Sequence, residues 1–405
     1  MAVRLETNSY RERRCLVTSE VVIVGAARTP FGKLLGGLSG LKATELGSYA
    51  IKGALGDIDP NVVEAVVMGQ VLQAGAGQNP AKQAALGAGI SPNAHTNTVN
   101  KVCLSGLTAV IDSARLIRAG EAEVVVAGGM ESMSNAPHLL PKSRTGTKYG
   151  EITMVDHMAW DGLTDAGKAI SMGELTEEFA DIYPVARQEQ DALAAESHNR
   201  AEQHRSILAR EIVPVTIKQR KADVTVAEDE GVRSGATAES MAGLRPAFTK
   251  EGTITAGSSS PISDGAAAVV LTTRERAEKE GWAVMAVLRS PGQVAGPDAS
   301  LQAQPAHALE KALEREGWSA ADLDIIEINE AFAAVGVYSA KQLGVSLDKV
   351  NPCGGAIALG HPIGASGARL VAHLAHRLAN GEAKKVGASL CGGGGQGEAI
   401  LMEAN

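Results

Sequence analysis

The chain has 405 residues, which is enough for two or three domains with substantial buried cores. Its 44% hydrophobic and 21% charged residues are close to the globular average, so the composition excludes a fibrous protein and pervasive disorder. The net charge of -8 excludes a general attraction to nucleic acid or to an anionic membrane surface. No apolar run reaches the roughly 18 residues of a membrane span. We therefore expect a globular, cytoplasmic protein.

The N-terminal segment and the cysteines exclude further classes. Residues 1–20 carry four arginines and three glutamates but no apolar segment, which argues against a signal peptide. A transit peptide stays open, and an extended, poorly ordered arm is the simpler interpretation. The four cysteines (Cys15, Cys103, Cys353 and Cys391) form no CxxC pair, so neither a disulfide framework nor a metal site is expected.

Short apolar runs alternate along the chain with helical patterns. The runs that predict buried strands lie at 20–24, 63–72, 123–129, 266–273, 323–331 and 384–390. Strands that alternate with helices favour an α/β architecture with a largely parallel sheet.

Two stretches of the chain resemble each other. Residues 109–129 read AVIDSARLIRAGEAEVVVAGG, and residues 367–393 read GARLVAHLAHRLANGEAKKVGASLCGG. Each has an amphipathic helix, a turn containing Gly-Glu-Ala and a buried strand that ends on glycines. The pattern predicts two related halves, although α/β proteins also repeat such units by chance. The charged, helical segment at about 133–260 is too long for a simple loop and predicts an inserted, substrate-facing subdomain.

Cys103 and His361 are the first candidates for chemistry. Cys103 follows a β-branched run and precedes a helical pattern, so its sulfur should lie near a helix N-terminus, where free amides and the helix dipole favour a thiolate. The alternative is a small buried residue. His361 stands between Gly360 and Pro362, so it is held firmly enough to serve as a base, unless it only bonds its own loop. For Cys353 we expect core packing.

Two further blocks end predicted strands. Cys391 precedes four consecutive glycines, which would let backbone amides approach a reacting oxygen and form an oxyanion hole. Asn329 and Glu330 precede a helix, where simple N-capping by Asn329 is the alternative to a catalytic role.

The four blocks together, VCLSG, NEAF, GHPIGASG and CGGGGQG, resemble the thiolase family in their order and separation, from about residue 20 to the end. The resemblance implies a thiolase fold, with two similar βαβαβαββ halves in a layered α-β-α-β-α arrangement and an inserted loop domain. The implied domains are residues 1–132 with 261–281, the loop domain 133–260, and residues 282–405.

The resemblance also implies roles for the site residues. Cys103 would be the acylated nucleophile, His361 its activating base, and Cys391 the group that exchanges a proton with the α-carbon of the second acyl-CoA. Asn329, through a bound water, and His361 would form one oxyanion hole, and the amides of Cys103 and Gly393 the other.

By the same resemblance the loop domain would contact coenzyme A. The residues implied to line a pantetheine tunnel are Leu163, Met172, Phe248, Ala256, Ser260 and Phe332. Arg233 would lie near the adenosine phosphates. The implied partners are acetyl-CoA, acetoacetyl-CoA, coenzyme A and identical chains in a dimer or tetramer, with no tightly bound cofactor, metal, nucleic acid or membrane.

The expected activity is that of an acetyl-CoA C-acetyltransferase, which condenses two acetyl-CoA by a ping-pong mechanism. Ser171 stands where short-chain biosynthetic thiolases commonly have a histidine, so a 3-ketoacyl-CoA thiolase of broader chain length is the alternative. A third possibility is a thiolase-like lipid-binding protein without chemistry. Cys391 argues against a ketoacyl synthase, which uses histidine or asparagine instead of a second cysteine.

Overall fold

The computed structural model describes residues 19–405 except 219 and 221, so the expected N-terminal arm lies almost wholly outside the described residues. Within these residues ten strands form one sheet in the order β12-β13-β14-β11-β1-β10-β5-β3-β4, with β2 paired to β10. The strands of the first half are β1 (Val21–Arg28), β2 (Gly32–Lys33), β3 (Ala65–Gly69), β4 (His95–Val99), β5 (Val124–Ser132) and β10 (Ser263–Thr273). Those of the second are β11 (Ala286–Ala295), β12 (Ile325–Ile328), β13 (Lys385–Gly392) and β14 (Gln396–Glu403). Each of the six predicted runs overlaps one of these strands.

The two halves use the same strand order, which confirms the predicted duplication. The first runs β4-β3-β5-β10-β1, and the second runs β12-β13-β14-β11 with a bridge from Ile326 to Val350 in the place of β4. The halves join where β1 pairs antiparallel with β11. The expectation of a largely parallel sheet is wrong. Among the described strands of this sheet, only the pairs β3–β4, β3–β5 and β12–β13 are parallel. The reason is that β14 follows β13 through a tight glycine turn and β10 returns antiparallel to β5 from the inserted segment.

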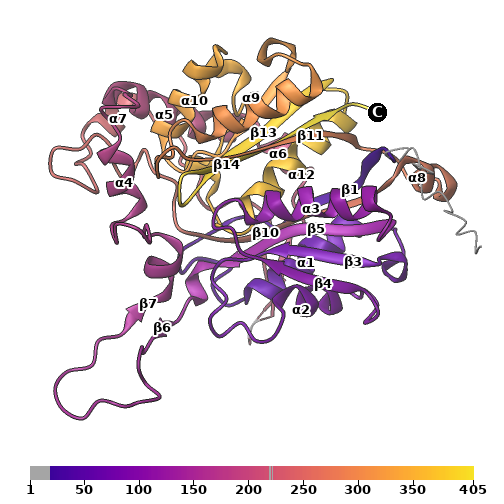
Figure 1. The fold of residues 1–405 in the computed structure, drawn as a ribbon, viewed down its shortest axis with the longest axis horizontal. Coiled ribbons are helices and arrows are strands. Elements are labelled where there is room, and N and C mark those ends of the chain that lie inside the picture. The colour runs from indigo at the N-terminus through magenta and orange to yellow at the C-terminus, as the bar shows by residue number, and fades with distance from the viewer. Residues whose placement is uncertain (1–18, 219, 221) are drawn as a thin grey trace, which may run out of the picture.

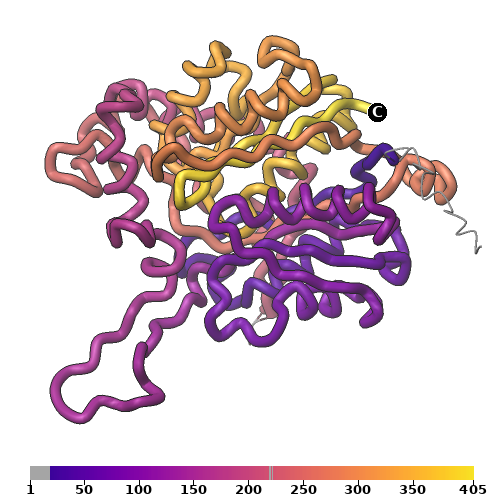
Figure 2. The backbone as a smooth tube through the Cα atoms, in the orientation of Figure 1, coloured from indigo at the N-terminus to yellow at the C-terminus, as the bar shows by residue number. Residues whose placement is uncertain are grey.

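Helices enclose the sheet in the expected α-β-α-β-α layers (Figure 1). Helices α1 (Ala43–Leu55) and α2 (Pro80–Gly87) pack on the outer face of the first half. Helices α9 (Gln304–Glu316) and α10 (Ala333–Leu343) cover the second half. Between the halves lie α3 (Ser105–Ala119) and α12 (Ser366–Ala379), whose apolar faces share one core with strands of both halves. Figure 2 shows the same stacking of the first half against the second.

The duplication has a constant spacing. Gly-Glu-Ala recurs at 120–122 and 381–383, and Ser-Gly recurs at 105–106 and 366–367, in both cases 261 residues apart. These pairs place α3 and β5 of the first half in correspondence with α12 and β13 of the second. Equivalent positions in the two halves can therefore be compared directly.

The segment between β5 and β10 has structure of its own. Its hairpin of β6 (His138–Leu139) and β7 (Val155–Asp156) projects from the body in Figures 1 and 2. The other helices and strands of the segment are α4 (Met172–Glu178), α5 (Arg187–Gln203), α6 (Arg205–Leu208), β8 (Val215–Ile217), β9 (Val224–Val226) and α7 (Ala238–Ala242). Outside it lie α8 (Arg274–Glu280) and α11 (Ala356–Leu359). The short non-α turns are η1 (Pro60–Val62), η2 (Met133–Asn135), η3 (Met158–Gly162), η4 (Ala320–Asp322) and η5 (Leu347–Lys349). The domain limits inferred from the sequence stay a prediction.

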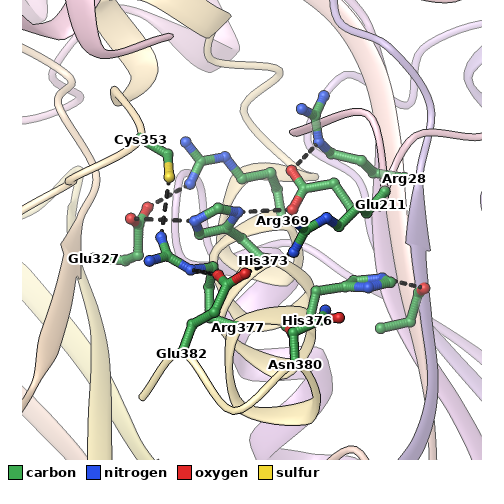
Figure 3. A network of polar contacts seen from close by, with 12 residues as sticks. Arg28, Glu211, Glu327, Cys353, Arg369, His373, His376, Arg377, Asn380 and Glu382 are labelled. Carbon is green, nitrogen blue, oxygen red and sulfur yellow. Dashed lines mark hydrogen bonds and ion pairs between the residues drawn. The ribbon is translucent and has the colours of Figure 1, made fainter. Parts of the chain in front are cut away.

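A buried ionic network fastens the inserted segment to both halves (Figure 3). Glu211 of the segment accepts hydrogen bonds from Arg28 Nε on β1 (2.6 Å) and from His373 Nδ1 on α12 (2.7 Å). On the same helix, Arg369 Nη1 donates to Glu327 of β12 at 2.6 Å. All these side chains are almost fully buried, and each carboxylate lies beside a cation, so the charges are compensated where water cannot reach them.

Candidate active site

Cys103 lies on a sharp turn between β4 and α3. Val102, just before it, has a φ of +50°, a conformation that a β-branched residue rarely adopts. Two hydrogen bonds of Ser105 hold the turn, because its hydroxyl accepts from the Lys101 amide (2.8 Å) and donates to the Val102 carbonyl (2.6 Å). The turn places Cys103 half-buried, two residues before the first residue of α3.

The surroundings of the Cys103 sulfur favour a thiol in the resting protein. Burial raises the pKa of the Cys103 thiol to about 12, and the charge of Glu131 acts in the same direction. The amides of Cys103 and Gly393 lower the pKa but do not offset the loss of water. The expected thiolate at the helix N-terminus is therefore not the resting state, and the sulfur needs a base that removes its proton during attack.

His361 has the hydrogen bonds of such a base. The Ser366 hydroxyl donates to the Pro362 carbonyl (3.0 Å), so it accepts from His361 Nδ1 at 2.6 Å. This assignment leaves the lone pair on Nε2, a buried atom without a hydrogen-bond partner in the described part of the chain. Burial lowers the pKa of His361 to about 4, so the imidazole is neutral at pH 7 and can accept a proton.

The loop of His361 and the turn of Cys103 are in close backbone contact. A Cβ added to Gly106, at the start of α3, would lie 2.9 Å from the Gly364 carbonyl oxygen and 2.8 Å from the Ala368 nitrogen. Cys103 itself packs in an apolar cluster with Ile363. Glycine at 106 therefore allows the two duplicated helix N-termini to meet at the site.

Cys391 and Asn329 approach from the second half. Burial raises the pKa of the Cys391 thiol, and the nearby Cys103 adds to the shift. Asn329 Nδ2 lies 3.4 Å from His361 Nδ1. Gly393 directs its amide at the Cys103 sulfur. The five predicted catalytic residues thus come together from four separate stretches of chain.

A cavity of about 770 Å³ borders this cluster. Val102 and Gly393 line it on the side of Cys103. Trp160, Lys168 and Met172 of the inserted segment also line it. A cavity of this size beside the nucleophile can hold a large substrate, with the reacting carbonyl near the amides of Cys103 and Gly393.

Most of the residues predicted to bind coenzyme A lie near the reacting sulfurs. Leu163 packs in the cluster of Cys103. Met172, Phe248 and Phe332 pack with Cys391, the two phenyl rings meeting edge to face with centroids 5.7 Å apart. The amide of Ser260 donates to the Ala331 carbonyl at 3.0 Å, beside the same cluster.

The other two predicted binding residues are exposed. Ala256 is exposed on a turn. Arg233 is exposed, its amide donates to His198 Nδ1 at 3.2 Å, and it lies outside the described lining of the cavity. Its contact with adenosine phosphates stays a prediction.

Sequence reasoning missed two polar residues of the site and one cap. Ser366 orients His361, and its recurrence 261 residues after Ser105 could have revealed it. Glu131 is a fully buried carboxylate near Cys103, signalled only by an acidic residue in an apolar strand. Ser171, which stands where short-chain thiolases commonly have a histidine, caps α4. Its hydroxyl accepts from the Glu174 amide (3.2 Å), and the Glu174 carboxylate accepts from the Ser171 amide (2.8 Å).

Comparison with known proteins identifies the class. The duplicated fold, the cysteine on its strained turn and the neutral histidine define an acyltransferase of the thiolase type. The model of the thiolase N-terminal domain matches residues 21–275, and that of the thiolase C-terminal domain matches residues 282–404. The chain belongs to the thiolase family.

Similar proteins of known sequence or structure cover the whole fold. A "Probable acetyl-CoA acetyltransferase" of Mycolicibacterium smegmatis is 54% identical over 94% of this chain and all of its own length. An "Acetyl-CoA acetyltransferase" of Cupriavidus necator is 49% identical over 95% of this chain and 99% of its own. The crystal structure of the Bacillus anthracis acetyl-CoA acetyltransferase superposes with a TM-score of 0.92 at 38% identity, over 96% of this chain and 99% of that one. In the described residues no helix is both long and apolar enough to cross a membrane.

Proposed function

We propose that the protein is an acetyl-CoA C-acetyltransferase, which converts two acetyl-CoA into acetoacetyl-CoA and coenzyme A through an acetylated Cys103. The observation that carries the proposal is the pairing of a thiol Cys103 with a neutral His361 whose Nε2 is unprotonated and unpaired in the described residues. The relatives named acetyl-CoA acetyltransferase support the choice of acetyl-CoA as substrate.

In the first half-reaction the Cys103 sulfur attacks the thioester carbonyl carbon while the thiol proton passes to His361 Nε2. The negative charge on the carbonyl oxygen is stabilised by the amides of Cys103 and Gly393. The carbon–sulfur bond to coenzyme A then breaks, and the departing thiolate takes the proton of the Cys391 thiol while His361 Nε2 keeps the proton it received. The acetyl group stays on Cys103.

In the second half-reaction the Cys391 thiolate, formed when its proton went to the departing coenzyme A, removes a proton from the methyl carbon of another acetyl-CoA. His361, with Asn329 acting through a water, would stabilise the enolate oxygen. The carbanion attacks the acetyl carbonyl on Cys103, and the thiolate of Cys103 leaves and recovers the proton held on His361 Nε2. The two cysteines thus serve different steps, one as nucleophile and one as base.

We propose coenzyme A thioesters as the substrates, with no tightly bound cofactor. The cavity of about 770 Å³ borders the nucleophile, and its lining carries Lys168, which pairs with Glu178, together with the carboxylates of Asp161 and Asp165. We propose identical chains as further partners, in a dimer or tetramer, and the cytoplasm as the location.

Two other functions remain to be tested. A 3-ketoacyl-CoA thiolase of broader chain length is favoured by Ser171, whose hydroxyl is used as a helix cap. A lipid-binding protein without chemistry would need no reactive cysteine. The steady-state rate of thiolysis, measured with free coenzyme A and 3-ketoacyl-CoAs of increasing chain length, separates the three.

Turnover limited to acetoacetyl-CoA and its near neighbours, and lost in Cys103→Ala, is the expected result. The matched control is Cys353→Ala, because Cys353 is buried in a different apolar cluster and should leave turnover intact. Rates that rise with chain length would instead assign a degradative thiolase. No turnover and no acetylation of the wild type would assign the non-catalytic function.

A further inference from the structure

Glu131 is a buried carboxylate that the proposed reaction does not use. It stands next to last in β5, is 0% exposed, and accepts three backbone hydrogen bonds. Its Oε2 accepts from the amides of Val71 (3.0 Å) and Gly364 (2.9 Å), and its Oε1 from the amide of Leu72 (3.1 Å). One side chain therefore joins three segments: the end of β5, the loop after β3 and the loop that carries His361.

The internal duplication shows what is unusual about this arrangement. At the constant spacing of 261 residues, Gly364 corresponds to Cys103 and Gly392 corresponds to Glu131. In the first half the amide of Cys103 faces its own sulfur and is available to a reacting oxygen. In the second half the amide of Gly364 is occupied by the Glu131 carboxylate. Because residue 392 is a glycine, the second half has no carboxylate equivalent to Glu131 that could occupy the amide of Cys103.

The loop held by Glu131 packs closely against its neighbours. A Cβ added to Gly364 would lie 2.9 Å from Glu131 Oε2 and 2.8 Å from the Gln70 Cα. A Cβ added to Gly129, in β5, would lie 2.0 Å from the Gly364 carbonyl oxygen. Gly364 is three residues after His361, so a displacement of this loop would also displace the imidazole of His361.

Resting on the acyl-transfer function proposed above, we infer that Glu131 is a positioning residue: its carboxylate holds the loop of His361 at the distance from Cys103 that proton transfer requires. A catalytic group displaced by about 1 Å can lose about 10²-fold in rate. The carboxylate is suited to this role because one oxygen can accept from two amides at once, whereas water would have to enter a closed site to replace it.

The negative charge of Glu131 should slow the reaction, whereas its positioning of the loop should speed it. Whether removing the carboxylate raises or lowers the rate therefore tells the two effects apart. Burial raises the pKa of Glu131 to about 7, against the three amides that lower it. When ionised, Glu131 raises the pKa of the Cys103 thiol and so disfavours the thiolate. If the charge were the main effect, its removal would leave the reaction unchanged or faster. If positioning is the main effect, removal slows it.

The test compares Glu131→Gln and Glu131→Ala in thiolysis of acetoacetyl-CoA. Glutamine has the same shape, but its NH₂ group would face the Leu72 amide, so we expect kcat to fall about tenfold. Alanine loses all three bonds, and we expect a fall of about 10²-fold. KM should stay within about twofold in both, because the loop does not line the cavity. If the alanine variant fails to fold, the glutamine variant decides.

The matched control is Glu211→Gln, another fully buried carboxylate, which accepts hydrogen bonds from Arg28 and His373 and none from the loop of His361. It should lower stability and leave kcat of the folded protein within about twofold. A loss of kcat in this control equal to that of Glu131→Gln would overturn the specific role of Glu131.

A double-mutant cycle tests whether Glu131 acts through His361. The readout is single-turnover acetylation of Cys103 by acetyl-CoA, followed by intact mass. In a His361→Ala background, Glu131→Gln should cause no further loss. An undiminished loss there, or wild-type kcat in Glu131→Gln alone, would overturn the inference while leaving the proposed function in place. A wild-type protein that is not acetylated at all would overturn the proposed function and the inference together.

Discussion

Replacing Glu211 with glutamine should lower the free energy of unfolding by about 3–5 kcal/mol, the usual cost of breaking a buried ion pair from one side. Glu211 is 1% exposed and is shared by Arg28, at 2.6 Å, and His373, at 2.7 Å. Burial raises its pKa, but His373 and Arg28 outweigh burial and hold the pKa of Glu211 well below its usual range. A neutral glutamine would leave two buried cations without their shared partner.

The pKa of His373 sets an upper limit on how far the network stabilises the charged imidazole. Burial lowers it, but Glu211 and then Glu327 outweigh burial and raise it from 6.5 to about 10. Since one pKa unit corresponds to about 1.4 kcal/mol, the network favours the imidazolium by at most about 5 kcal/mol. A pKa raised on folding stabilises the protein fully below pH 6.5, and the contribution is lost as the pH rises through about 10.

Urea denaturation of the wild type and Glu211→Gln between pH 6 and pH 10 measures both effects. The gap in unfolding free energy should be widest near pH 6 and shrink toward pH 10. The control is Asp112→Asn, which breaks an exposed pair with Arg115 and should change stability by less than about 1 kcal/mol. A Glu211→Gln variant within about 1 kcal/mol of the wild type at pH 6 would refute the reasoning.

The remaining predictions concern the site and the packing beneath it. Because a protonated His361 cannot accept a proton, acetylation of Cys103 in brief pH pulses should decline as the pH falls through about 4, the pKa of His361; a decline centred near pH 6.5 would contradict the effect of burial. Gly129→Ala should abolish activity or folding, since its Cβ would lie 2.0 Å from the Gly364 oxygen. Gly243→Ala, with open space around the added carbon and a φ of -75°, should change the melting temperature little; equal losses in the two glycine variants would show that crowding at Gly364 is not the cause.

Much of the fold could be read from local patterns. The apolar runs at 20–24 and 384–390 predicted strands because burial on both faces selects continuous β-branched and small residues. The recurrence of Gly-Glu-Ala after an amphipathic helix predicted the duplication, which the matching strand order confirms. Strand direction was not predictable in this way, because a run of apolar residues has the same pattern in parallel and antiparallel pairs. The largely parallel sheet was therefore the wrong expectation.

The candidate site, like the fold, was predictable from the sequence only in part. Cys103, His361, Asn329, Cys391 and Gly393 could be named as candidates from the sequence, because each lies in a short motif that resembles a motif of the thiolase family. The protonation states of Cys103 and His361 could not be predicted from the sequence. Burial sets both pKa values, and burial is decided by segments far along the chain. A helix N-terminus next to Cys103 pointed to a thiolate, and desolvation outweighs it.

The sequence by itself predicted which residues carry the chemistry, and it determined that the chain has two similar halves. Only the tertiary structure decided which partner each buried charge meets. Glu131 meets the amide of Gly364, 233 residues away, and Arg28 meets Glu211, 183 residues away. The physical reason is that a motif records local backbone needs, whereas a buried charge is permitted only by partners that folding brings to it.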